Sequence, residues 1–306
     1  MTRRELLAAT LASPALFAKT NKIGRSRLSA ITDEIAKTPA DAIAFAKLYG
    51  MQWLELRDVP GRKIVYNALP EPELKAAAKE FQDAGIKISF LNSGMLKFAL
   101  PGTEPKRSRP ESPEAKAKRM ASDQKRFADR MDELDKAIRA AHILGCTKVR
   151  VFAFLRVEEP EKIYPRVVDV IGEMTKVAER EKIQLLLENE GSCNVGTSAE
   201  LATFLKLLPS KALGLNWDPL NAVALKESVF PEGYSLLPKK KIWNVQYKGR
   251  SILDYPQKMD WAAIIHALEK DGYQGQLGLE THIFGEEQVQ RSHESTKAML
   301  KIVGDA

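Results

Sequence analysis

The chain has 306 residues, of which 44% are hydrophobic and 28% are charged, and its formal net charge is +7. These values are typical of one globular domain and exclude both an intrinsically disordered chain and a multispanning membrane protein. The densest basic stretch, residues 106–119, is interleaved with glutamates, so we interpret it as a solvated loop and expect no nucleic-acid partner. The two cysteines, Cys146 and Cys193, are too few for a disulfide framework.

Residues 1–18 have the pattern of an export signal. The pair Arg3 and Arg4 is followed by a short, mostly apolar run that ends in small residues at Ala18. The run is too short to span a bilayer comfortably, and it lacks the polar stripe of the alternative, an amphipathic capping helix. We predict a twin-arginine-type signal at 1–18, a linker at 19–26, and a periplasmic mature protein without a stable membrane anchor. If the signal does not function, the protein stays in the cytoplasm.

Strand and helix patterns alternate from residue 27 onward. In the first half of the chain, strands are predicted at 27–33, 52–57, 86–91 and 147–154, and helices at 38–49, 72–84, 113–144 and 160–181. Thr38 and Pro39 are typical of a helix N-terminus, whereas Gly85 and Gly145 are typical of helix ends. A loop rich in proline and charge, residues 100–112, precedes the long third helix.

The second half of the chain continues the alternation. Strands are predicted at 183–188, 213–218, 242–246 and 276–280, and helices at 198–208, 260–270 and 286–303, with a less regular stretch after Val223. Eight strands alternating with helices predict a single-domain (β/α)8 TIM barrel over residues 27–306. An open doubly wound sheet is the alternative fold. It is disfavoured because neither a Gly-rich phosphate loop nor a dinucleotide fingerprint follows an early strand.

The four strands of the second half each end in a residue that can bind a divalent metal. These residues are Glu188, Asp218, Gln246 and Glu280. A TIM barrel places the carboxyl ends of all its strands around one mouth, so these side chains should converge there. Three converging carboxylates repel one another unless something positive lies between them. The pattern therefore predicts one divalent metal ion, although a helix cap or a turn is the alternative explanation for any one of these residues alone.

Three of these strand ends carry a second polar residue on the same face, two positions from the proposed ligand. These residues are Glu190, Lys248 and His282. Polar residues on the inner face of a barrel belong to its upper layer, where substrate binds. We therefore predict that Lys248 lies at the mouth and that Glu190 and His282 reach the substrate.

Other polar residues at or near predicted strand ends are weaker candidates. Glu55, Asn92 and Arg156 could bind the hydroxyl groups of a substrate, or could be rim residues without a role. Trp217 and Trp243 neighbour proposed ligands but lie on the opposite strand face, so we expect them to pack between the barrel and its helices.

The residues around these strand ends resemble those of the xylose isomerase-like superfamily of TIM barrels. The matching segments are 187–190, 216–221, 245–248 and 278–280, and segments 32–34 and 54–57 fit as well. That superfamily includes sugar isomerases and epimerases, inosose dehydratases and, more distantly, endonuclease IV. The resemblance extends over nearly the whole chain after the predicted signal, and it indicates the superfamily more strongly than the substrate.

The resemblance implies a metal held by Glu, Asp, His and Glu at the ends of strands five to eight. In this sequence the corresponding residues are Glu188, Asp218, Gln246 and Glu280, so Gln246 replaces the usual histidine. An amide oxygen favours Mn²⁺, with Mg²⁺ or Co²⁺ as alternatives, over Zn²⁺. Asn221 also stands where a histidine is common in the family, and we count it among the substrate-binding candidates.

The function implied by the resemblance is a metal-dependent isomerase or epimerase acting on a carbohydrate. The ion would acidify a C–H bond beside a carbonyl, Glu188 and Glu280 would take and return the proton, and Lys248 would stabilise the negative charge. Two alternatives stay open, namely a lyase that uses the same proton abstraction for β-elimination and a non-catalytic sugar-binding barrel. A DNA repair activity like that of endonuclease IV would need more histidines than the four present.

The expected partner is a small-molecule carbohydrate, which would be unphosphorylated if the protein is exported. Members of the family often form dimers or tetramers, so a homo-oligomer also stays open.

Overall fold

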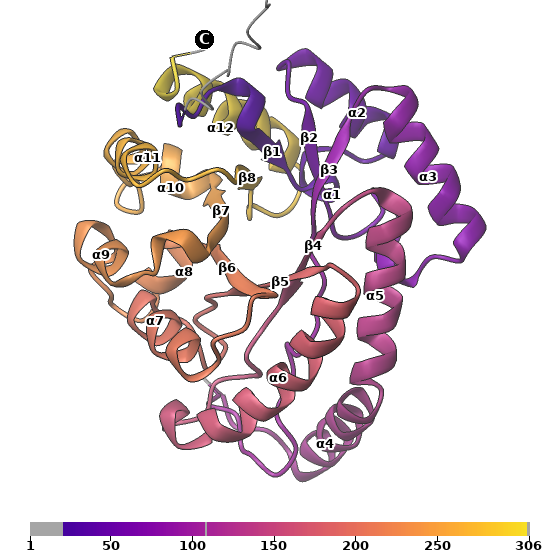
Figure 1. Cartoon of the computed structure of the whole chain (residues 1–306), viewed down its shortest axis with the longest axis vertical. Helices are drawn as coiled ribbons and strands as arrows, with labels where there is room; N and C mark the ends of the chain where they lie inside the picture. The colour runs from indigo at the N-terminus through magenta and orange to yellow at the C-terminus, as the bar shows by residue number, and fades with distance from the viewer. Residues whose placement is uncertain (1–20, 108, 305–306) are drawn as a thin grey trace, which may run out of the picture.

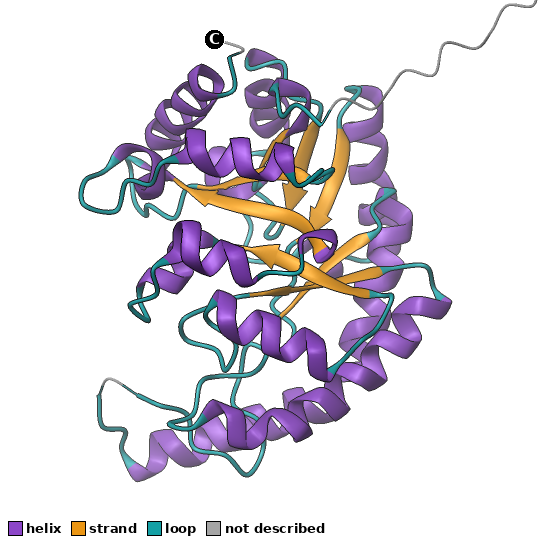
Figure 2. Ribbon diagram, turned by 60° about the vertical axis from the view of Figure 1, so that its left-hand side comes forward, coloured by secondary structure: helices purple, strands orange, loops and turns teal. Residues whose placement is uncertain are grey.

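The computed structural model describes residues 21–107 and 109–304, so the export signal predicted at 1–18 lies outside the described residues. Eight parallel strands form the centre of the molecule, and helices surround them (Figure 1 and Figure 2). The predicted single-domain (β/α)8 TIM barrel is confirmed. None of the described helices is long and apolar enough to cross a membrane.

The strands follow one another around the barrel in chain order. They are β1 (Leu28–Ala30), β2 (Trp53–Leu56), β3 (Lys87–Leu91), β4 (Lys148–Val151), β5 (Gln184–Glu188), β6 (Leu213–Trp217), β7 (Ile242–Lys248) and β8 (Gln276–Glu280). Strand β1 meets β2 in one bridge, between Ile31 and Glu55, and the only registered pair of β3 and β4 among the described residues is Leu91 with Val149. The barrel is therefore nearly closed, with two weakly paired seams on either side of β2 and β3.

The helices form the outer layer. They are α1 (Thr32–Ile35), α2 (Pro39–Leu48), α3 (Glu71–Asp83), α4 (Pro113–Ala128), α5 (Arg130–Leu144), α6 (Tyr164–Arg180), α7 (Ser198–Leu207), α8 (Pro219–Val223), α9 (Tyr234–Leu236), α10 (Gly249–Leu253), α11 (Trp261–Lys270) and α12 (Gln288–Ile302). The single helix predicted at 113–144 is wrong, because α4 and α5 are separated at Asp129, whose φ of −81° and ψ of 0° interrupt the helical run. Aspartate is a weak helix former in a helix interior.

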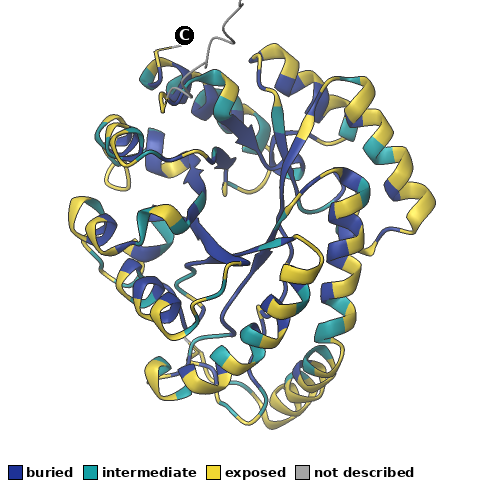
Figure 3. Ribbon diagram, in the orientation of Figure 1, coloured by how far each residue is buried: buried dark blue, intermediate teal, exposed yellow. Residues whose placement is uncertain are grey.

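The core consists of the strands and of the inward faces of the helices. Figure 3 shows the strands buried and the outer helix faces exposed. Trp217 is fully buried against Tyr234, whose ring centroid lies 5.3 Å away. Trp243 packs over Gly214, where a Cβ atom would lie 2.2 Å from the indole ring. Trp217 therefore packs outside the barrel interior, as the alternation of strand faces predicts. The same prediction is wrong for Trp243, which lines a hollow together with Lys148 and Gln184.

Strand β7 is longer than predicted at its carboxyl end. It ends at Lys248, two residues beyond the predicted end, because Lys248 is in register with Glu280 of β8. This extension holds Lys248 within the sheet, at the carboxyl end of the barrel, which we call the mouth.

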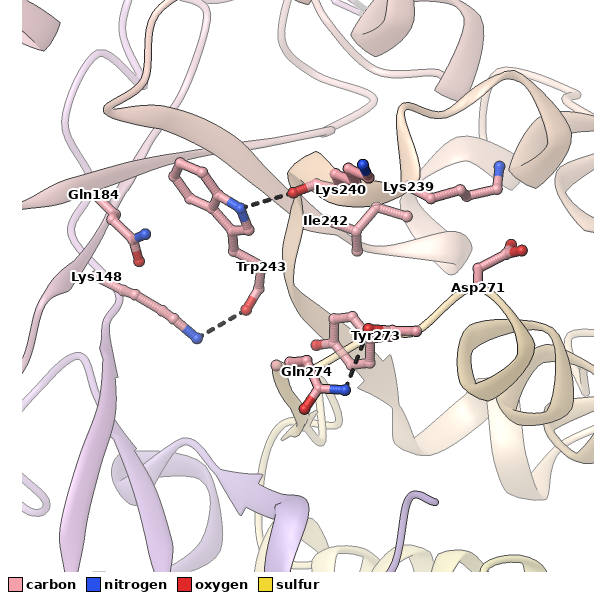
Figure 4. A pocket seen from close by; sticks show the side chains of 11 residues that line it. Lys148, Gln184, Lys239, Lys240, Ile242, Trp243, Asp271, Tyr273 and Gln274 are labelled. Carbon is pink, nitrogen blue, oxygen red and sulfur yellow. Dashed lines mark hydrogen bonds between the residues drawn. The ribbon is translucent and has the colours of Figure 1, made fainter. Parts of the chain in front are cut away.

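The amino-terminal ends of the strands form the opposite end of the barrel, which we call the base. A hollow there is lined by the first residues of β4, β5 and β7 and by the segment before β8 (Figure 4). The ammonium of Lys148 points into it and donates hydrogen bonds to the backbone oxygen of Trp243, at 2.8 Å, and to Oε1 of Gln276, at 3.1 Å. Both acceptors are neutral.

Candidate active site

Three of the four predicted metal ligands come together at the mouth. Glu188 ends β5, Asp218 directly follows β6, and Glu280 ends β8. One carboxylate oxygen from each lies within 4.8 Å of the others, close enough to share one ion. All three residues are buried. We call them the carboxylate triad.

Each member of the carboxylate triad has a cationic partner. Arg150, from β4, lies 3.1 Å from Glu188. The Lys248 ammonium lies 3.0 Å from Oδ2 of Asp218 and 3.2 Å from Oε2 of Glu280. Glu280 also contacts Arg57, which follows β2, at 3.2 Å. The mutual repulsion of the buried carboxylates is thus offset by side chains of the chain itself.

Lys248 and Glu280 are both held in their charged forms. Burial by itself would lower the pKa of the Lys248 ammonium, but the negative charges around it, chiefly Asp218 and Glu280, hold this pKa above its ordinary value. Burial would likewise raise the pKa of the Glu280 carboxyl, but the charges of Lys248, Arg57 and Arg150 hold it well below its usual range. Glu280 is therefore ionised throughout the neutral pH range.

Asp218 titrates near neutral pH. Burial raises the pKa of its carboxyl to about 7, against the attraction of Lys248 and with added repulsion from Glu280 and Glu188. Its backbone is fixed by Asn189, because Asp218 N donates to Asn189 Oδ1 at 2.8 Å. A carboxyl with this pKa can accept or donate a proton at physiological pH.

Gln246, the fourth predicted ligand, is bound to a carboxylate inside the barrel. Its amide nitrogen donates to Oε2 of Glu55 at 2.5 Å. Its amide oxygen is buried and has no hydrogen-bond partner among the described residues. Because the amide nitrogen is bound to Glu55, the amide oxygen of Gln246 is the atom left available to a further partner.

Glu55 lies below the mouth and is fully buried. It accepts hydrogen bonds from four neutral groups, and burial, the largest influence, raises the pKa of its carboxyl. The donors are Ser29, Asn92, Asn244 and Gln246. Gly278 makes room for it, because a Cβ atom there would lie 2.0 Å from Oε1 of Glu55. Glu55 is thus placed to orient other side chains and has no exposed surface for a substrate.

A second acidic group adjoins the triad through Glu280. Oxygens of Glu34 and Glu280 and a ring nitrogen of His282 lie within 4.8 Å of one another. Glu34 is fully buried, and it accepts hydrogen bonds from Arg57, at 2.8 Å, and from the backbone nitrogen of His282, at 2.7 Å. Burial, with the charge of Glu280, raises the pKa of Glu34 to about 7.

His282 is exposed and has a positive φ of 50°, a conformation uncommon for a residue other than glycine. Residues held in such conformations often occur at functional sites. Its ring packs against that of Phe284, with centroids 5.1 Å apart. His282 therefore forms part of the rim beside Glu280, as its strand position predicts.

The remaining predicted residues differ in their burial and in their partners. Asn221 accepts a hydrogen bond from Lys248 at 2.6 Å, and Glu190 pairs with Lys97 at 2.7 Å. Asn92 is buried beside Glu55, and its backbone oxygen accepts from Arg150. Arg156 lies instead with Glu200, at 2.6 Å, so its guanidinium is already engaged in an ion pair.

Four charged residues of the site did not emerge from the sequence as candidates, namely Asp33, Glu34, Arg57 and Arg150. Arg150 offered a signal, because it lies two residues after Lys148 on the inner face of a predicted strand, where a charge needs a partner. Arg57 and Glu34 lie in segments that resemble the family, but nothing local showed that they would pair with each other.

The donors at the mouth fit a divalent cation. Five carboxylates, of Asp33, Glu34, Glu188, Asp218 and Glu280, are linked by ion pairs to three cations, those of Arg57, Arg150 and Lys248. With all five ionised, the cluster has an excess of two negative charges. The triad supplies oxygen ligands, and the buried amide oxygen of Gln246 has no hydrogen-bond partner in the part of the chain that the structure describes. Oxygen ligands of this kind suit Mg²⁺ and Mn²⁺.

Several solved structures share this fold. The IOLI protein, described with a binding zinc atom, has a TM-score of 0.67 and 18% identity, covering 91% of this chain and 98% of its own. The 3-keto-D-glucoside 4-epimerase from E. coli has a TM-score of 0.67 and 12% identity, covering 90% of this chain and 98% of its own. The probable 3-DHS dehydratase from Bacillus anthracis has a TM-score of 0.67 and 15% identity, covering 89% and 98%.

At these identities the likeness to solved structures establishes the fold alone. A comparison with curated proteins finds no match to this chain. The family model described as the xylose isomerase-like TIM barrel matches residues 43–299, which is most of the chain. The match includes the triad and every strand from β2 to β8. The chain belongs to the xylose isomerase-like TIM barrel family.

Proposed function

We propose that this protein is a divalent-metal-dependent isomerase or epimerase that acts on a carbohydrate by abstracting a proton next to a carbonyl. The observation that carries the proposal is the carboxylate triad, buried at the barrel mouth with the Lys248 ammonium between two of its members. Active sites of TIM barrels lie at this end of the strands. The fold likeness to a 3-keto-D-glucoside 4-epimerase supports the same class of substrate.

Glu188, Asp218 and Glu280, with the amide oxygen of Gln246, would hold the ion. A bound divalent ion would polarise the carbonyl of the substrate and so acidify the neighbouring C–H bond. Oxygen-only ligands favour Mn²⁺, with Mg²⁺ or Co²⁺ as alternatives.

Glu188 and Glu280 are the proposed proton acceptor and donor. Glu280 is ionised at neutral pH, because Lys248 and Arg57 hold the pKa of its carboxyl low. Glu188 is kept in place by Arg150 and by Asn216, whose amide donates to Oε2 of Glu188 at 2.5 Å. The charge of Lys248 would stabilise the negative charge that develops on the substrate oxygen when the proton leaves.

Residues around the triad would bind the rest of the carbohydrate. Asn221, Glu190 and His282 lie around the mouth and offer groups that could bind hydroxyls. Buried Glu55 and Asn92 would act through Gln246 and Arg150, by orienting them, and not by direct contact with substrate.

A lyase that eliminates a group β to the abstracted proton is the second candidate. The observation that favours it is Glu34, which lies beside Glu280 and whose buried carboxyl has its pKa raised to about 7, since a carboxyl that carries a proton near neutral pH can protonate a leaving group. The fold likeness to a probable dehydratase supports this candidate too.

The proposed location is the periplasm, after export through a signal at residues 1–18, and it favours an unphosphorylated substrate. N-terminal sequencing of the protein purified from the periplasmic fraction tests this part. A mature N-terminus shortly after Ala18 is expected, whereas an intact N-terminus in the cytoplasmic fraction contradicts export.

Hydrogen exchange with solvent tests the reaction, because isomerase, epimerase and lyase share the proton abstraction. The Mn²⁺-loaded protein is incubated in D₂O with a panel of unphosphorylated sugars and keto-sugars, and deuterium at carbon is followed by mass spectrometry. We expect incorporation with at least one substrate and a loss of about 1000-fold in Glu280→Gln.

Glu179→Gln, on the exposed face of α6, is the matched control and should keep full activity. Circular dichroism should show both variants folded. Full exchange activity in Glu280→Gln would remove Glu280 from the mechanism. Tight binding of a sugar without any deuterium incorporation would instead point to the non-catalytic sugar-binding barrel.

A further inference from the structure

The Lys248 ammonium lies where a metal ion would have to bind. It is 3.0 Å from Asp218 and 3.2 Å from Glu280, two members of the carboxylate triad. A third acceptor, Oδ1 of Asn221, lies 2.6 Å away. The contact with Asn221 is a hydrogen bond, and the contacts with Asp218 and Glu280 are ion pairs.

Hydrogen bonds from neighbouring groups hold both Lys248 and Asn221 in place. The backbone nitrogen of Lys248 donates to Oγ of Ser251 at 3.2 Å, and Ser251 is held in turn by the indole N–H of Trp261 at 3.1 Å. The Asn221 amide is oriented by a bond from its Nδ2 to the backbone oxygen of Asn189 at 2.9 Å. Lys248 is therefore a built part of the site and not a surface lysine that happens to lie near it, since only 4% of its side chain is exposed.

A divalent ion on the same oxygens would lie close to this ammonium. Carboxylate oxygens bind such ions at about 2.0–2.6 Å, so an ion and an ammonium sharing Asp218 and Glu280 would be only about 4–5 Å apart. Two cations at that distance repel each other strongly in a partly buried site. The oxygens of the triad can therefore serve one of the two cations well, but not both.

We propose that the Lys248 ammonium is the resident cation of the carboxylate triad and that a divalent ion binds there by displacing it. Without metal, the site then keeps one positive charge in contact with Asp218 and Glu280, and the ion is an exchangeable activator held weakly. Gln246 fits this arrangement, because its amide nitrogen is engaged by Glu55 and only a neutral oxygen is left to strengthen ion binding.

The inference rests on the ion site of the proposed function, but its test does not depend on turnover. The binding of Mn²⁺ alone to EDTA-treated protein is measured by isothermal titration calorimetry for the wild type and for Lys248→Met. We expect Lys248→Met to bind Mn²⁺ about 100-fold more tightly than the wild type, because the competing charge is gone.

Lys97→Met is the matched control. Lys97 pairs with Glu190 at the mouth, 2.7 Å away, and does not form an ion pair with the triad. Its loss should leave Mn²⁺ affinity within about threefold of the wild type. An equal gain in both variants would show a general charge effect and overturn the proposal.

Asn221→Leu provides a second route if Lys248→Met does not fold. It removes one of the three acceptors and leaves the ammonium in place, so we expect a smaller gain in Mn²⁺ affinity, about tenfold. The proposal that the ion displaces Lys248 is overturned if the folded Lys248 and Asn221 variants bind Mn²⁺ no more tightly than the wild type. It is also overturned if none of the proteins binds Mn²⁺. A gain in affinity without any sugar turnover supports the exchange while counting against the proposed reaction.

Discussion

Lys148 and Lys248 are two largely buried lysines at opposite ends of one barrel, and they are held in opposite ways. At the base, Lys148 donates to two neutral oxygens, and burial lowers the pKa of its ammonium. At the mouth, Lys248 is even more buried, yet the carboxylates around it hold its pKa above the ordinary value. The partners of a buried lysine, and not its burial alone, decide whether it carries a firm positive charge.

The contrast distinguishes a lysine that joins strands, Lys148, from a lysine that neutralises nearby carboxylates, Lys248. Lys148 connects β4 to β7 and β8 by hydrogen bonds to a backbone carbonyl and a side-chain amide, and neither acceptor is charged. Lys248 keeps acidic groups together that would otherwise repel one another. The two ends should therefore respond differently when the lysine is removed.

The largest effect is expected for Lys248→Met in the absence of metal. Removing one partner of a buried ion pair leaves the carboxylates of Asp218 and Glu280 facing each other, so the free energy of unfolding should fall by about 3 kcal/mol or more. Urea denaturation in EDTA measures this change, and added Mn²⁺ should restore part of the loss. A change below about 1 kcal/mol would show that the carboxylates are stabilised by other means.

The second effect is a loss of stability when the hydrogen bonds of the buried Glu55 carboxylate are disturbed. A methyl group introduced by Gly278→Ala would collide with the Glu55 carboxylate and disturb its four hydrogen bonds, and we expect a loss of about 2 kcal/mol in stability. Gly94→Ala is the matched control, because a Cβ atom there would meet no atom of residues 21–107 or 109–304 within 4 Å. Equal stability of the two variants would mean that Glu55 can move aside freely.

The third effect is a pH dependence that should exist at the mouth because of Glu34. Burial and the charge of Glu280 raise the pKa of Glu34 from 4.5 to about 7, so the folded protein binds this proton more tightly than the unfolded chain does. The resulting stability is present below pH 4.5 and is lost as the pH rises to 7. Glu34→Gln should flatten this part of the stability profile by an amount on the order of 1–2 kcal/mol. Parallel profiles for the variant and the wild type would contradict the assignment.

The smallest effect is expected at the base. Lys148→Met should lower the free energy of unfolding by about 1 kcal/mol, because it frees only neutral acceptors that water in the adjoining hollow can reach. Denaturation beside Lys248→Met gives the comparison directly. If the two variants lost equal stability, the distinction between neutral and anionic partners would fail.

Much of the fold could be predicted from the sequence because each element carries its own local signal. Apolar runs mark the strands, and Gly145, with a φ of 69°, ends its helix as expected. The break at Asp129 had only a weak signal, the low helix propensity of aspartate, since neither proline nor glycine marks it. The extension of β7 to Lys248 also had none, because it depends on pairing with β8.

The site was predictable to the extent that strand ends and strand faces determine it. Glu188, Asp218 and Glu280 could be grouped because parallel strands end at one mouth. The contacts of Glu55 with Gln246, of Arg150 with Glu188 and of Lys248 with Asp218 depend on how far side chains reach across the barrel. That reach is a property of the tertiary structure, and it decides which of the predicted residues can touch a ligand.

The two sparse seams of the barrel have a consequence for its motions. Strands β2 and β3 are joined to their neighbours by one bridge on one side and by one registered pair on the other. Such a unit can separate from the rest at a lower free energy than the well-paired strands β4 to β8, so its amide hydrogens should exchange sooner. Because Glu55 and Arg57 belong to this unit, its opening would release Gln246 and Glu280 together. The carboxylate triad thus lies on the well-paired strands of the barrel, whereas Glu55 and Arg57, which contact Gln246 and Glu280, lie on or beside a weakly paired strand.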